Sequence, residues 1–269
     1  MIKYSFVTGV YNTPLNYLEL FFNSIFNSDV FDECEIIIFN DGSNSITTSY
    51  LYEKKKSCSK ITILGDGKNH GLAYGLNRCI EIAKGTYIVR ADSDDYFLPE
   101  RVSLQEKYLQ KNKYDIVGCN MYLFDKDGVW GEQMYKEVIS KYDFIKTSPV
   151  AHPTVIMRAD IFFDKKNFYS ESKKCLRNED YELFMRLFSN GYKIGNFQRS
   201  LYFFREDNDS AKRRTFYSRI NEMKVKFHGF KLLKYPFYMF VYCLRPILIG
   251  LLPKSIYIRL KKKKSGVIK

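Results

Sequence analysis

Apolar residues follow two different rhythms in the two halves of this chain. In the first half, short β-branched runs at 4–10, 35–39, 61–64 and 87–89 alternate with helical patterns at 15–26, 45–56 and 72–83. Apolar strands joined by helices of this length favour a mostly parallel sheet with helices on both faces. The pattern therefore predicts an α/β fold.

The second half departs from this alternation. A helix beginning at Pro99 and a strand at 115–124 lead to a turn at 125–128. We then expect a strand at 154–157, a helix at 179–189 and two strands at 192–197 and 201–204. The pattern predicts one domain over residues 1–211, with a nucleotide-binding half over about 1–125 and an acceptor half over about 126–211. Residues 212–269 form a C-terminal extension.

The net charge of +13 is carried by this extension. Residues 212–269 contain sixteen basic residues and one acidic residue, whereas the rest of the chain is almost neutral. A nucleic-acid-binding fold usually carries its positive charge across its body, so the asymmetry predicts a basic appendage and no nucleic-acid partner. The six cysteines form no CxxC pair, and no secretory signal precedes the first strand, so we expect reduced thiols in the cytoplasm.

Two acidic clusters follow predicted strands, at the edge of the sheet where such folds bind ligands. Asp41-Gly42-Ser43 alone is more typical of a turn that caps the next helix. Asp92-Ser93-Asp94-Asp95 places three carboxylates within four residues, which need a compensating cation such as Mg²⁺ or Mn²⁺ bound to phosphate. The glycine patterns of dinucleotide-binding and P-loop proteins are absent from the sequence.

A third acidic pair, Glu179 and Asp180, opens the helix at 179–189. Acidic residues at this position also interact favourably with the helix dipole, and Asn178 is placed to be the N-cap. Asp180 shares a face with the apolar Leu183 and Phe184, whereas Glu179 is expected on a wetter side. Because partial burial raises the pKa of a carboxyl group, Asp180 is the stronger candidate for a general base.

The ordered series of motifs resembles a family 2 glycosyltransferase with the GT-A fold, over about residues 2–206. The motifs are VTGVYN (7–12), NDGS (40–43), GLAYGLN (71–77), AKGTYIVRADSDD (83–95), LPER (98–101), HPTV (152–155) and NEDY (178–181). The acidic run followed by LPER resembles the branch that builds bacterial capsule, O-antigen and related surface polysaccharides. Two positions depart from the family pattern: Gly9 replaces a frequent proline, and Asn40 replaces a frequent acid, which makes the base of the nucleotide less secure.

The resemblance implies a role for each matching residue. Thr8, Val10 and Tyr11 would border the base and ribose, and Asp41 would hydrogen-bond a uracil ring. Asp92 would contact the ribose or donor sugar and Asp94 would ligate the metal, with Asp92 as a second ligand. Asp180, seconded by Glu179, would deprotonate the acceptor hydroxyl. Further donor contacts are expected from Asn77, Arg90 and Ser93, and acceptor or other contacts from Asp95, His152, Trp130 and Arg205. For His152 and Trp130, structural roles are the simpler interpretation.

The apolar stretch at 236–253 is interrupted by Arg245 and Pro246, so it is too short and too polar to span a bilayer. Flanked by lysines, it is more typical of a segment that lies in a membrane interface, although a helix packed on the domain is the alternative.

These observations predict an inverting, metal-dependent hexosyl- or N-acetylhexosaminyltransferase, peripheral to the cytoplasmic face of the membrane. It would move a sugar from a nucleotide diphosphate sugar, UDP-linked by preference, to a lipid-linked or growing surface glycan. A sugar-nucleotide nucleotidyltransferase and a non-catalytic membrane or nucleic-acid binding module are the alternatives.

Overall fold

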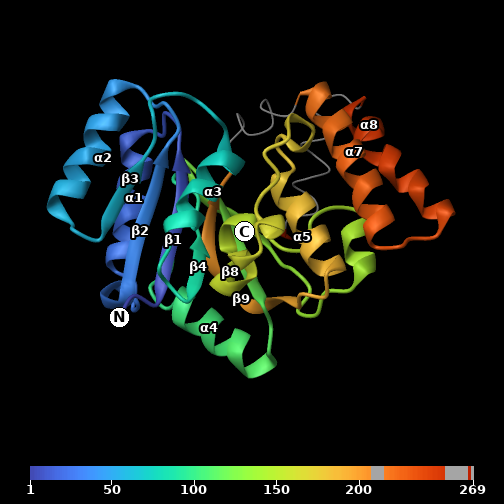
Figure 1. Ribbon diagram of the computed structural model, residues 1–269, viewed down its shortest axis with the longest axis horizontal. Coiled ribbons are helices and arrows are strands. Elements are labelled where there is room, and N and C mark those ends of the chain that lie inside the picture. Colours follow the sequence, from blue (N-terminus) through green and yellow to red (C-terminus); the bar gives the residue numbers. More distant parts are fainter. Residues whose placement is uncertain (207–214, 252–265, 268–269) are drawn as a thin grey trace.

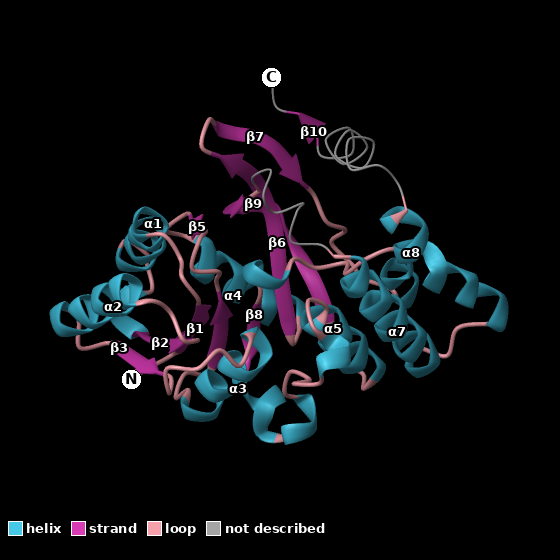
Figure 2. Ribbon diagram, turned by 90° about the horizontal axis from the view of Figure 1, so that it is seen from above, coloured by secondary structure: helices cyan, strands magenta, loops and turns pink. Residues whose placement is uncertain are grey.

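The computed structural model describes residues 1–206, 215–251 and 266–267, and shows a mixed sheet with helices on both faces (Figure 1). The strands are hydrogen-bonded in the order β10-β7-β6-β8-β4-β1-β2-β3, and β9 pairs with β6 and β5. Figure 2 shows the long strands β6 and β7 rising away from the parallel part of the sheet, with α5, α7 and α8 on one side. The predicted α/β fold is confirmed.

The first half follows the predicted alternation closely. Strands β1, β2, β3 and β4 run parallel to one another. Their bounds, with those of the helices between them, are β1 Tyr4–Val10, α1 Leu15–Phe26, β2 Cys34–Asn40, α2 Ser45–Ser57, β3 Ile61–Leu64, α3 Leu72–Ile82 and β4 Tyr87–Arg90. Each differs from its expected range by at most one residue at either end, because apolar runs bounded by polar turns define these elements.

The second half contains the departures. Its elements are β5 Tyr96–Phe97, α4 Arg101–Asn112, β6 Ile116–Asp125, β7 Gly128–Gln133, β8 Ile156–Arg158, α5 Glu179–Ser189 and β9 Ile194–Arg205. The prediction of two strands at 192–197 and 201–204 was wrong. They form the single strand β9, whose pairing with β6 shifts register around Asn120. Exposed Gln198 and Arg199 lie opposite this irregularity, and their polarity was mistaken for a turn.

Alternate residues of the parallel strands feed two hydrophobic clusters, one on each face of the sheet. Phe6 and Ile38 pack with α1, α2 and α4, whereas Val7 and Ile37 face α3 and α5. Strands buried on both faces contain nearly continuous apolar runs, as in CEIIIFN of β2. Only their carboxyl ends are left for polar chemistry.

The extension begins with α7 (Phe216–Leu232), continues through a 3₁₀ helix at Phe237–Leu244, and reaches α8 (Arg245–Gly250). Val225 and Phe230 of α7 join the cluster that contains α5, so this helix packs on the domain. The predicted boundary at 211/212 lies outside the described residues. Within the described part of the chain, no helix is long and apolar enough to cross a membrane.

Candidate active site

Three carboxylates gather in the loop that follows β4. Oxygen atoms of Asp92, Asp94 and Asp95 all lie within 4.8 Å of one another. Asp95 is buried, and its Oδ2 has no hydrogen-bond partner. Burial, reinforced by the charges of Asp94 and Asp92, raises the pKa of Asp95 well above its usual range. Clustered carboxylate oxygens with an unsatisfied buried acceptor fit a hard divalent cation, and the choice between Mg²⁺ and Mn²⁺ stays a prediction.

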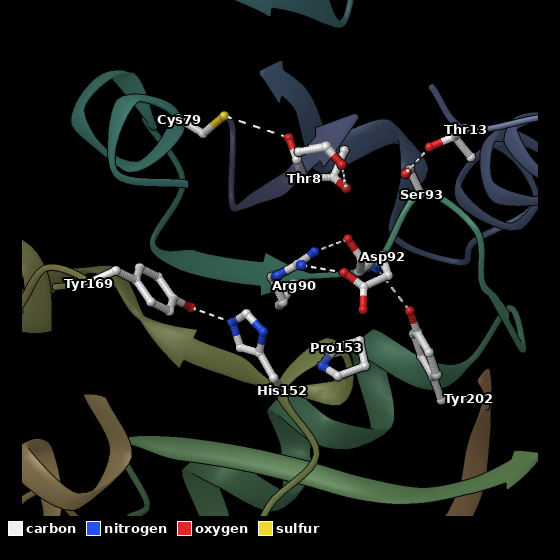
Figure 3. A network of polar contacts seen from close by, with 12 residues as sticks. Thr8, Thr13, Cys79, Arg90, Asp92, Ser93, His152, Pro153, Tyr169 and Tyr202 are labelled. Carbon is white, nitrogen blue, oxygen red and sulfur yellow. Dashed lines mark hydrogen bonds and ion pairs between the residues drawn. The ribbon is translucent and has the colours of Figure 1, made fainter. Parts of the chain in front are cut away.

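Arg90 and Tyr202 hold Asp92 in place (Figure 3). The fully buried guanidinium of Arg90 donates to the Asp92 carboxylate and to the Ala91 carbonyl. The backbone N–H of Asp92 donates to the Tyr202 hydroxyl at 3.0 Å. Arg90 is the last residue of β4, so its contact with Asp92 fixes the direction in which the loop leaves the strand.

Arg205, at the end of β9, fastens the rest of the loop. Its backbone N–H donates to Asp95 Oδ1 at 2.7 Å, and its Nε donates to the Asp94 carbonyl at 3.0 Å. The guanidinium lies 3.5 Å from the centre of the Tyr17 ring. The structure therefore places Arg205 beside the carboxylates, where it orients the Asp95 carboxylate and the backbone at Asp94.

The segment that follows β1 meets this loop from the first half of the chain. Thr8 and Val10 are buried, whereas Tyr11 is exposed at the rim. Thr13 and Ser93 share a hydrogen bond of 2.8 Å between their hydroxyls, which joins the segment after β1 to the loop after β4. The residues that the resemblance assigns to the base and ribose thus lie next to the carboxylates.

Asp41 ties the end of β2 to the start of α3. Its carboxylate accepts hydrogen bonds from the backbone N–H groups of His70, at 2.6 Å, and Gly71, at 3.0 Å. Gly42 has φ +74°, and a Cβ there would lie 2.8 Å from the backbone of Lys68, so only glycine fits. The cap of α2 is Asn44, not Asp41. The contact of Asp41 with a uracil ring stays a prediction.

Asn77 of α3 contacts the second half of the chain at Tyr169. Its amide accepts from the backbone N–H of Tyr169 at 2.9 Å and donates to the Tyr169 carbonyl at 2.9 Å. The Tyr169 hydroxyl in turn shares a hydrogen bond of 2.8 Å with His152 Nε2. Burial, with the charge of nearby Arg90, lowers the pKa of His152 well below its usual range, so the ring is neutral. His152 is outside the carboxylate cluster, and its described contacts are structural.

Asp180 is half-buried at the start of α5. Burial first, and then the charge of Glu179, raise the pKa of Asp180 to about 6; the charge of Asp92 adds to this effect, so the two groups lie near each other. A carboxyl group with this pKa is ionised at neutral pH and is basic enough to accept a proton. Asp180 is therefore close enough to the strand-end carboxylates for the charge of Asp92 to act on it, and its role as the base stays a prediction.

The prediction that Glu179 lies on a solvent-exposed side of α5 was wrong. Glu179 and Glu182 are both buried, and burial raises the pKa of Glu179. Glu182 Oε1 accepts a hydrogen bond from Arg186 Nε at 2.8 Å, a pairing four residues apart that lets a polar face pack inward.

Trp130 of β7 is half-buried against the core and donates from its indole to the Glu206 carbonyl at 3.3 Å. This contact supports the packing interpretation of Trp130.

Two cavities flank the sheet. The one of about 370 Å³ lies at the carboxyl ends of β2 and β3, beside Asn40, Ser43 and Thr48. The other, of about 1280 Å³, lies at the amino end of β4 and contains none of the predicted site residues. The carboxylates, rather than cavity size, therefore locate the site.

Comparison with known proteins now adds to this geometry. Residues 5–163 match the model of the family described as glycosyl transferase family 2. The chain belongs to this family.

Relatives and solved structures extend the likeness over the whole chain. This glycosyltransferase is 31% identical to the putative glycosyltransferase EpsE of Bacillus subtilis, over 99% of this chain and 98% of EpsE. It is 28% identical to a UDP-Glc:alpha-D-GlcNAc-diphosphoundecaprenol beta-1,3-glucosyltransferase, WfaP of Escherichia coli, over 63% of this chain and 64% of that protein.

Two solved structures show the same fold. S. aureus TarS 1-349 in complex with UDP-GlcNAc matches 98% of this chain and 71% of its own, with a TM-score of 0.67 and 19% identity. The mannosyltransferase PcManGT from Pyrobaculum calidifontis, in complex with GDP-Man and Mn²⁺, matches 97% and 79% with a TM-score of 0.63 and 13% identity. Family membership supports a glycosyltransferase over the two alternatives.

Sequence reasoning assigned no role to Arg101 of this glycosyltransferase. The residue is fully buried, and its Nη2 donates to the carbonyls of Arg90, at 2.8 Å, and Pro153, at 3.3 Å. Its guanidinium lies 4.9 Å from the centres of the Phe97 and Tyr202 rings. A signal was present, because a cation at the first position of a helix opposes the helix dipole and so indicates another purpose.

Proposed function

We propose that this glycosyltransferase transfers a hexosyl or N-acetylhexosaminyl group from a nucleotide diphosphate sugar, UDP-linked by preference, to a hydroxyl of a lipid-linked or growing surface glycan, with inversion. The observation that carries the proposal is Asp180, a half-buried carboxyl group with a pKa of about 6 beside the cluster of Asp92, Asp94 and Asp95. A group able to accept a proton thus lies within reach of the charge of a set able to hold a cation and a diphosphate.

In the proposed reaction, the donor diphosphate lies at the carboxyl ends of β1, β2 and β4. Asp180 takes the proton of the acceptor hydroxyl as its oxygen bonds to the anomeric carbon. The bond from that carbon to the diphosphate oxygen breaks, and its electron pair leaves with the nucleotide. Asp92 and Asp94, together with the buried Asp95, would hold the divalent cation. When bound, the cation would neutralise charge on the leaving diphosphate. Arg90 and Arg205 keep these carboxylates oriented.

The proposed acceptor follows from the names of two relatives. WfaP is named for transfer to a diphosphoundecaprenol-linked sugar, and WbnJ of Escherichia coli is named as an O-antigen biosynthesis glycosyltransferase. The name of WfaP supports a lipid-linked acceptor here, and that of WbnJ supports a surface glycan. One structural neighbour binds UDP-GlcNAc and another GDP-Man, so the screen of donors must include both bases.

The test is nucleotide release from a panel of UDP- and GDP-sugars with Mn²⁺, followed by the anomeric configuration of the product. We expect a UDP-sugar to be turned over, and an α-linked donor to give a β-linked product. Asp180→Ala should abolish release, whereas Glu182→Gln, on the same helix, should lower stability but keep turnover. Retention of configuration, or full turnover by Asp180→Ala, would contradict the mechanism.

A further inference from the structure

The extension carries an apolar surface that the rest of the described chain leaves exposed. Phe237 is 90% exposed and Leu248 is 62% exposed. The docking face, as we call it here, consists of Phe237, Tyr238, Val241, Leu244, Leu248 and Leu251, all of them exposed. Large apolar side chains gathered on two short consecutive helices are typical of an interaction site rather than of isolated surface residues.

The underside of these helices is packed, so the face is oriented by structure. Cys243 and Pro246 are buried, and the Phe240 ring lies 5.9 Å from the Phe230 ring of α7. The Arg245 guanidinium donates to the Lys146 carbonyl at 2.9 Å. The exposed apolar side chains therefore project from a surface that is fixed on the domain.

Helix α7 connects this surface to the helix that carries the proposed base. Lys226 of α7 is fully buried and donates to the carbonyls of Ile145, at 3.2 Å, and Lys146, at 3.0 Å. Gly229 lies so close to α5 that a Cβ there would be 2.2 Å from the Met185 sulfur. Figure 1 shows α7 directly beside α5, with α8 on its outer side.

Charge identifies the occupant of the face. Lys224, Lys231 and Lys234 are exposed on the same extension, and residues 212–269 contain sixteen basic residues and one acidic residue. A second copy would bring like charges together, whereas an anionic lipid surface complements them. Exposed Phe, Tyr and Leu beside lysines are the side chains that enter the boundary between headgroups and acyl chains.

We propose that the docking face seats this protein on an anionic lipid bilayer, with Phe237 and Leu248 entering the interface and α7 holding α5 at a fixed position relative to it. With only six residues, α8 is too short to span a bilayer, so the contact is in the plane of the surface. The binding requires neither donor nor acceptor, so it is tested separately from the transferase reaction.

The experiment is sedimentation of the full chain with vesicles of phosphatidylglycerol and phosphatidylcholine, compared with phosphatidylcholine alone. We expect strong partition only to the anionic vesicles, weakened by salt. Phe237→Ser combined with Leu248→Ser should lower the partition coefficient about tenfold or more, because two apolar side chains no longer leave water. Thermal stability should be unchanged, since both side chains are exposed in the free protein.

A matched pair of substitutions controls for general loss of surface hydrophobicity. Phe163, 86% exposed, and Ile46, 67% exposed, lie on other elements, so Phe163→Ser with Ile46→Ser should leave partition as in wild type. The proposal would be overturned if both pairs of substitutions lowered the partition coefficient equally. It would also be overturned if the wild type bound neutral and anionic vesicles equally well. A dimer that dissociates when Phe237 and Leu248 are changed would overturn it too, because the face would then belong to a second copy.

A fluorescence measurement locates the face in the membrane. Tyr238→Trp should shift the emission to shorter wavelength with anionic vesicles, whereas Ile46→Trp should not, with Trp130 a constant background in both. An unchanged Tyr238→Trp spectrum in the presence of bound vesicles would place the contact elsewhere and overturn the proposal.

Discussion

The two sets of carboxylates in this glycosyltransferase are of the same chemistry but are held in opposite ways. The strand-end set, Asp92, Asp94 and Asp95, is oriented by Arg90 and Arg205. At the helix start, Glu179 is buried and Asp180 is half-buried, and burial is the largest cause of their raised pKa values. The environment therefore separates the two roles, a cation-binding set and a proton-accepting set.

The largest effect is expected from Asp180→Asn, which leaves the shape of the site but removes the proton acceptor. Turnover should fall by about 10²–10⁴-fold, and the amount of Mn²⁺ needed should not change. The raised pKa also means that the folded state binds more protons than the unfolded state between about pH 4 and 6, so this carboxylate costs stability above pH 6. We therefore expect the variant to unfold at higher temperature, by calorimetry at pH 7; lower stability with equal activity would contradict the assignment.

Asp94→Asn tests the other set. Replacing a carboxylate by an amide removes the charge that attracts a divalent cation, so turnover should fall by about 10²-fold at fixed Mn²⁺ and recover partly as Mn²⁺ is raised. The measurement is nucleotide release against metal concentration. Asp127→Asn, in the exposed turn after β6, is the control and should behave as wild type. If the turnover of Asp94→Asn were lowered equally at every Mn²⁺ concentration, the strand-end carboxylates would not be the cation-binding set.

A smaller effect should appear in the pH profile. Because Asp180 must be ionised to act, kcat/KM of the wild type should fall below about pH 6. Glu179→Gln removes the nearby charge, so the acidic limb should move to lower pH by less than about one unit, since burial remains the larger cause. A limb that stays in place would mean that another group controls it.

The smallest effect concerns the support behind α5. Gly229→Ala would place a Cβ against Met185, which is fully buried, and overpacking should cost about 1–3 kcal/mol of unfolding free energy. Turnover should fall only a few-fold, because the helix shifts without losing Asp180. In a double-mutant cycle with Met185→Ala, the double variant should lose less unfolding free energy than the sum of the two single losses. Full additivity in chemical denaturation would show that the helices are not in contact there.

The sequence predicted what is local in this molecule. Strands with apolar runs, and carboxylates a few residues apart such as Asp92 and Asp94, are visible without tertiary structure. The bulge in β9 and the links from Arg101 to Pro153 and from Asn77 to Tyr169 depend on residues far apart in the chain. No pattern along the chain contains such pairings, so they could not be predicted.

The amide of Asn77 has a consequence for how acceptor choice can change. Residues 159–178 contain only 3₁₀ turns, yet one side chain of α3 fixes the backbone of Tyr169 in both directions. Arg186 also donates to the Lys166 and Phe168 carbonyls, so the segment is held mainly through its backbone and tolerates replacement of its other side chains. Exchange of this segment with that of a relative should therefore transfer acceptor preference while donor preference stays with the recipient, which makes Asn77 the natural joint for building hybrid enzymes.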